Sequence, residues 1–134
     1  MSFKKKYSYS KKVTESEIDH LNHVNNIEYL KWVQEASTLH WESISNEELN
    51  KKYFWVVLRH EIDYYVSVKL NDKIIITTYI GDSYSVKSER FVEIQNNGKL
   101  VAKAKTIWCL MAKNNMKPVR IPEEITVILN KIKI

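Results

Sequence analysis

The chain of 134 residues has a net charge of +5, with 44% hydrophobic and 28% charged residues, which predicts a single soluble globular domain over residues 1–134. No apolar run approaches the roughly 20 residues that a membrane helix needs, and the lysines at 4–6 precede no apolar segment of the kind found in signal peptides. The one cysteine, Cys109, excludes an intrachain disulfide and favours a reducing, cytoplasmic environment.

The first third of the chain predicts a strand, a polar turn and a long helix. Aromatic and β-branched residues alternate loosely over residues 7–13, as in a strand. From Asn26 to Ile44 apolar residues recur every three or four positions, which predicts a helix. Further apolar residues widen this stripe, so we expect the helix to be buried on most of its circumference. Residues 45–49 predict a short capped helix or turn.

In the rest of the chain, apolar and polar residues alternate with a period of two. Segments rich in Val, Ile, Thr and aromatic residues predict strands over residues 53–65, 73–81, 86–95 and 99–112. Asn96-Asn97-Gly98 predicts a tight hairpin between the last two, because Asn and Gly accept positive φ angles. Pro122 and the two acids after it predict the start of a C-terminal helix. These elements define an α+β fold, and we expect the antiparallel sheet to curl around the long helix.

The strongest functional signal is the polar segment directly before the long helix. Asp19, two histidines and three asparagines fall within residues 19–26. The free N–H groups and the dipole of a helix N-terminus favour developing negative charge. A carboxylate beside them suits the hydrolysis of an activated acyl group such as a thioester. The alternative is structural, since Asp and Asn are also good helix caps and turn residues.

The same segment resembles the signature of the hotdog-fold acyl-CoA and acyl-ACP thioesterases, the broad family that includes 4-hydroxybenzoyl-CoA thioesterase. Asp19, His23-Val24-Asn25-Asn26 and Tyr29 are the residues that match. The likeness continues through residues 56–64, 71–73, 100–108 and 118–122. It implies a hotdog fold, an antiparallel sheet wrapped around one long central helix. It also implies hydrolysis of an acyl-CoA or acyl-ACP to a free acid and a thiol.

The resemblance assigns roles to single residues. Asp19 matches the catalytic carboxylate, and Asn26 matches the position whose backbone amide holds the thioester oxygen. His23 and Asn25 match residues that orient water or substrate. Tyr29 matches a tyrosine common on the helix, where it would contact the substrate.

Three further residues complete the expected substrate site. Asn22 stands where many relatives have glycine. At the neighbouring position, Leu21, plant-type acyl-ACP enzymes have an asparagine. Asn22 would take the place of that asparagine. Arg59 and His60 lie on the strand that borders the dimer seam in hotdog proteins, which implies a contribution to the substrate pocket of a homodimer or homotetramer.

The resemblance implies no metal and no cofactor, because coenzyme A is part of the substrate. Asp19, His20 and His23 on one turn would make a poor tetrahedral set without a remote ligand. Cys109 lies between two apolar residues of a strand, so we expect a small core residue rather than a nucleophile.

Other functions stay open at this stage. The same fold serves non-catalytic acyl-CoA-binding proteins, which Asp19 argues against, and hydratases, whose histidine motif we do not find. The positive charge leaves open a small nucleic-acid-binding domain, yet the lysines are scattered and the tryptophans occupy core-like positions. That charge equally suits the phosphates of coenzyme A. We therefore expect no nucleic-acid partner and no membrane insertion.

Overall fold

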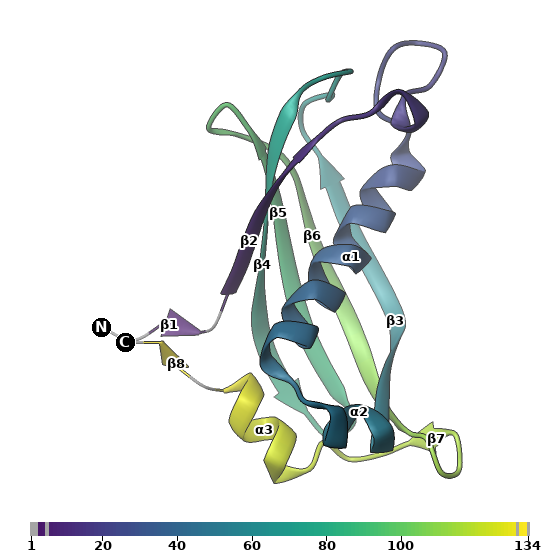
Figure 1. Ribbon diagram of the computed structural model, residues 1–134, viewed down its shortest axis with the longest axis vertical. Helices are drawn as coiled ribbons and strands as arrows, with labels where there is room; N and C mark the ends of the chain where they lie inside the picture. The colour runs from purple at the N-terminus through teal and green to yellow at the C-terminus, as the bar shows by residue number, and fades with distance from the viewer. Residues whose placement is uncertain (1–2, 5, 131, 134) are drawn as a thin grey trace.

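The computed structural model describes residues 3–4, 6–130 and 132–133, and one long helix lies against a curled antiparallel sheet (Figure 1). The helices are α1 (Asn26–Ile44), α2 (Glu47–Lys52) and α3 (Glu123–Leu129), with a short 3-10 helix η1 (Glu15–Glu17). The strands are β1 (Phe3–Lys4), β2 (Lys6–Lys12), β3 (Tyr53–Tyr64), β4 (Lys73–Tyr84), β5 (Lys87–Asn96), β6 (Lys99–Ala112), β7 (Lys117–Pro118) and β8 (Ile132–Lys133). This confirms the α+β class and places every predicted helix and strand within a few residues of its expected bounds.

The main sheet has the strand order β2-β4-β5-β6-β3, with β7 added to β6, while β1 and β8 form a separate pair. All of these pairs are antiparallel. Asn97 and Gly98 have φ angles of 52° and 77°, as a two-residue hairpin turn requires, so the predicted β5–β6 hairpin is confirmed. Strand β3 pairs with β6 on one side only, which leaves one long edge of the described sheet unpaired.

The burial of α1 differs from the prediction. Its buried residues follow one stripe: Tyr29, Trp32, Val33, Ala36, Ser37 and His40. Ile27 is 58% exposed, although the periodicity places it with the apolar residues. The expectation that most of the helix circumference is buried is therefore wrong for the described chain. The physical reason is that the sheet curls along one side of α1 and leaves the opposite side open (Figure 1).

The interior holds two apolar clusters with a polar layer between them. One cluster surrounds Trp32 and Val33 of α1, and the other joins Leu49 to Leu110 and to α3. The buried polar residues Thr78, Arg90, Thr106 and His40 lie on strands β4, β5, β6 and on α1. Cys109 is buried, as expected of a core residue. None of the described helices is both long and apolar enough to cross a membrane.

Candidate active site

Residues 18–24 form a closed loop in front of α1. Asp19 N–H donates to the His23 carbonyl (2.8 Å), and a bridge between Ile18 and Val24 closes the loop at its base. Asn22 has a φ angle of 62°, a left-handed conformation that Asn tolerates better than most residues. This conformation explains why asparagine, or glycine in the family that the sequence resembles, suits the position.

The Asp19 carboxylate is held by backbone donors. Its Oδ1 accepts hydrogen bonds from the N–H groups of His23 (3.1 Å) and Leu21 (2.9 Å). The bond from His23 lowers the pKa of Asp19 most; partial desolvation opposes it, and the bond from Leu21 lowers the pKa further. Asp19 is therefore ionised at neutral pH. No described residue donates to its second oxygen, Oδ2.

The N-terminus of α1 lies beside this carboxylate. Asn25 caps the helix, because its Oδ1 accepts from Ile27 N–H (3.2 Å), and its own N–H donates to the Glu17 carbonyl (3.0 Å). Asn26 is the first helical residue, and its N–H donates to no acceptor among the described residues. A free donor of this kind is what the first turn of a helix offers to an anionic oxygen.

A cavity of about 270 Å³ brings these groups together. Asp19, His23, Val24, Asn26 and Tyr29 line it from one side, and residues 64–67 line it from the other. Tyr29 is buried, and its ring packs edge-on against that of Tyr64 at 5.1 Å. Burial raises the pKa of Tyr29, so the phenol stays neutral. The cavity thus joins a carboxylate, a helix N-terminus and aromatic walls.

The other expected site residues lie outside this cavity. The backbone of Asn22 shapes the loop, and Asn25 acts as the cap. The Arg59 side chain is 67% exposed and pairs with Glu61 (2.6 Å). His60 is on the opposite face of β3, where its Nδ1 lies 2.8 Å from Thr106 Oγ1, and burial lowers its pKa.

Glu17, which the sequence patterns did not single out, holds the loop at its base, where its carbonyl accepts from Asn25 N–H. Its buried carboxylate accepts from Trp32 Nε1 (2.9 Å) and Thr14 N–H (2.9 Å), and it pairs with Lys11 Nζ (2.9 Å). The signal was present, since Thr14-x-x-Glu17 has the spacing of a capping box. Burial raises the pKa of Glu17, but the donors, led by Lys11, outweigh it and bring the pKa to about 2.

Residues 13–129 match the thioesterase-like superfamily, so the chain belongs to this superfamily. The match includes the loop with Asp19, α1 and strands β3 to β6. No curated protein matches the chain at the level of sequence. Among the described residues, no group of three or more His, Cys, Asp or Glu side chains is arranged to hold a metal ion.

Solved structures show the same fold. A 1,4-dihydroxy-2-naphthoyl-CoA thioesterase from Synechocystis has 17% identity and a TM-score of 0.81, over 93% of this chain and 96% of the other. A Staphylococcus aureus protein in complex with CoA has 19% identity and a TM-score of 0.86, over 98% and 89%. The probable thioesterase YbaW from Escherichia coli has 22% identity and a TM-score of 0.80, over 92% and 98%. These likenesses confirm the expected hotdog fold.

Proposed function

We propose that the protein hydrolyses an acyl thioester of coenzyme A, with Asp19 as the catalytic carboxylate. The observation that carries the proposal is the shared cavity, which is lined by the ionised Asp19 and by Asn26, whose N–H has no described acceptor. Membership of the thioesterase-like superfamily supports the reaction class. The similarity to a structure that holds CoA supports coenzyme A as the carrier of the acyl group. An acyl carrier protein presents the same kind of thioester.

The chemistry needs few groups because the leaving thiolate is stable. Asp19 acts either as a base that takes a proton from water while that water attacks the carbonyl carbon, or as the nucleophile itself. The carbonyl oxygen becomes an oxyanion, which the Asn26 N–H stabilises. The intermediate then expels the thiolate, and the thiolate takes up a proton. In the nucleophilic route, water hydrolyses the resulting anhydride and releases Asp19.

The remaining cavity residues orient the substrate. His23 lies at the exposed side of the cavity, where it orients water or the thioester. Tyr29 forms an aromatic wall of the cavity, and its hydroxyl stays neutral. Asn22 and Asn25 fix the loop and the start of α1, so they position Asp19 and the free N–H group.

We further propose that two copies pair through their β3 edges. The unpaired edge of β3 is 12 residues long, and Leu58 on this strand is 52% exposed. Proteins normally cover a long, apolar strand edge of this kind. Two-fold antiparallel pairing would place the Tyr53 end of one β3 beside the Tyr64 end of the other. Because Tyr64 lines the Asp19 cavity, that cavity would then adjoin the second copy, with Arg59 and His60 near the symmetry axis.

A panel of acyl-CoA and acyl-ACP substrates tests the proposal, with thiol release followed by a chromogenic thiol reagent. We expect at least one acyl thioester to be hydrolysed with enzymatic turnover. If acyl-CoA binds and none of the thioesters is cleaved, the protein is a non-catalytic acyl-CoA-binding member of the fold, and the proposed function is wrong.

A further inference from the structure

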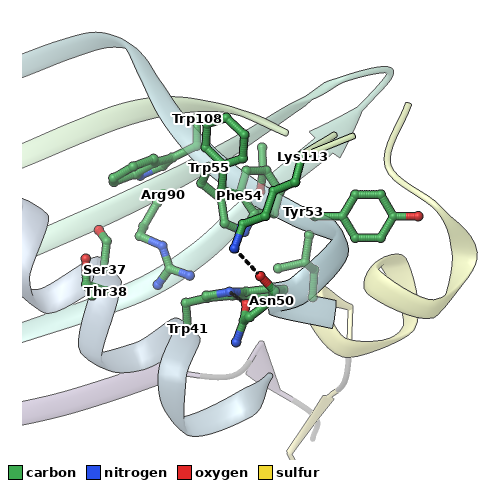
Figure 2. Close-up of a pocket in the computed structure, with 12 residues that line it drawn as sticks. Ser37, Thr38, Trp41, Asn50, Tyr53, Phe54, Trp55, Arg90, Trp108 and Lys113 are labelled. Atoms are coloured by element: carbon green, nitrogen blue, oxygen red, sulfur yellow. Dashed lines mark hydrogen bonds between the residues drawn. The ribbon is translucent and has the colours of Figure 1, made fainter. Parts of the chain in front are cut away.

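A second cavity, of about 240 Å³, lies at the opposite end of α1 from Asp19. Figure 2 shows the residues that line it. Three tryptophans line it from three different elements: Trp41 of α1, Trp55 of β3 and Trp108 of β6. Two basic residues also line it, Arg90 and Lys113, and none of the described acidic residues does. The cavity is therefore aromatic and positively charged.

Arg90 is the unusual member of this lining. Its side chain extends from β5 toward α1 and is only 6% exposed (Figure 2). Its Nη1 donates to His40 Nδ1 (2.7 Å) and Thr78 Oγ1 (3.2 Å). No described carboxylate forms an ion pair with it. Buried arginines are normally paired with an anion, because an isolated buried charge is costly.

A structural role accounts for only some of the hydrogen-bond donors of Arg90. The bonds from Nη1 brace His40 and Thr78, but a guanidinium has five N–H donors. The donors on Nη2 and Nε meet no acceptor among the described residues. Burial lowers the pKa of Arg90 only to about 10, so the group is still a cation at neutral pH. A desolvated cation with an open pair of donors remains beside the cavity.

Trp108 adds an independent observation. Its Nε1 is buried and has no hydrogen-bond partner among the described residues. Buried polar atoms are rarely left without a partner, so each exception calls for an explanation, such as strain, a functional role, or a bound water or ion. Two residues that line the cavity, on β5 and β6, thus carry donors without a described acceptor.

We propose that this cavity receives the far end of the acyl group, and that Arg90 selects acyl groups that end in a carboxylate. A guanidinium binds a carboxylate through two parallel hydrogen bonds, which the open Nη2 and Nε donors permit. The aromatic walls suit the hydrocarbon part between the carboxylate and the thioester. The inference rests on the proposed function, because it assigns the substrate class of the same reaction.

The proposed pairing of two copies explains how one acyl group can occupy this cavity while its thioester lies beside Asp19. Within one copy, Asn26 and Trp41 are separated by most of α1, roughly 22 Å at 1.5 Å per residue. Antiparallel pairing of β3 instead places the Tyr53 end, which lines the Arg90 cavity, beside the Asp19 cavity of the second copy. One substrate would then span two copies, with its thioester at one and its far end at the other.

The first test compares ω-carboxyacyl-CoAs with methyl-ended acyl-CoAs of equal chain length. We expect kcat/KM to favour the carboxylated substrate by about 10- to 100-fold at the best length, as a charged hydrogen bond allows. Arg90→Met should abolish this ratio, and Arg90→Lys, which keeps the charge without the fork, should reduce it. The matched control Arg120→Met removes an exposed arginine outside the cavity and should keep the ratio.

The second test needs no thioester. Calorimetry should show that benzoate binds the wild-type protein at least about 10-fold more tightly than the neutral benzamide, and that Arg90→Lys reduces the difference. If no thioester is cleaved while this preference depends on Arg90, the proposed function fails and the carboxylate site stands. The inference is overturned if methyl-ended acyl-CoAs react as fast as their ω-carboxy partners at every length. It is also overturned if free CoA displaces benzoate, since the cavity would then hold the phosphates of the carrier.

Discussion

Replacing Glu17 by glutamine tests how the loop with Asp19 is held in place. The carboxylate of Glu17 accepts from Trp32 and Thr14 and pairs with Lys11, while its backbone carbonyl accepts from Asn25. Glutamine keeps the shape and one acceptor oxygen but loses the charge. We therefore expect a less stable protein with an unchanged fold.

The pKa of Glu17 gives the magnitude and the pH dependence. A fall from 4.5 to about 2 corresponds to roughly 3 kcal/mol of stability. Because the folded-state pKa is depressed, this stabilisation is fully present above about pH 4.5 and is lost as the pH falls toward 2. Glu17→Gln should thus cost about 2–3 kcal/mol at pH 7, or roughly 6–15 °C in Tm. The difference from the wild type should shrink below pH 4.5.

Urea unfolding at pH 7, 4.5 and 3 measures this difference. Glu15→Gln is the matched control, because Glu15 lies on the same short helix and is exposed, and it should change the free energy of unfolding by less than about 0.5 kcal/mol. Wild-type stability of Glu17→Gln at pH 7, or the same loss of stability at all three pH values, would contradict this role of Glu17.

Further substitutions at Asn26, Asn25 and Leu58 test catalysis, capping and assembly separately. Asn26→Ala keeps the backbone N–H and should lose less than about 10-fold in rate. Asn26→Pro, which a first helical position accepts, should fold but lose about 10²–10³-fold in rate. Equal losses in both variants would contradict the role of the backbone N–H. Asn25→Ala should lower the stability by about 1 kcal/mol in thermal denaturation, and an unchanged Tm would show that the cap is dispensable. Leu58→Asp should convert the dimer into a monomer, as measured by sedimentation at micromolar concentration. Val127→Asp, on the exposed side of α3, should leave the dimer intact. A monomeric wild type would refute the β3 pairing.

Local patterns made most of the fold predictable. The bounds of α1 follow from the cap at Asn25 and the apolar repeat, and the β5–β6 hairpin follows from Asn97 and Gly98. The burial of α1 was not predictable in the same way, because periodicity shows that a helix has an apolar face but not how far a sheet curls around it. The exposure of Ile27 comes from that tertiary arrangement.

The two cavities show where the sequence is less informative. Asp19 and Asn26 are seven positions apart around one turn, so local geometry alone predicted that they meet. Residues 64–67 reach the same cavity through the sheet, which no local pattern reveals. Arg90 left a weak signal, since it is in phase with the buried Val92 and Ile94 of β5, and a charged residue on an inward face calls for a partner.

The most direct test of the proposed function is the turnover of Asp19→Asn on the preferred acyl-CoA. Asparagine keeps an acceptor for the N–H groups of Leu21 and His23, so the loop and the Tm should change little. We expect kcat to fall by about 10²–10⁴-fold while acyl-CoA still binds, and Glu124→Gln, an exposed change on α3 outside both cavities, should keep wild-type turnover. Near wild-type turnover by Asp19→Asn would contradict the carboxylate mechanism and leave Asp19 with the structural role of a turn residue.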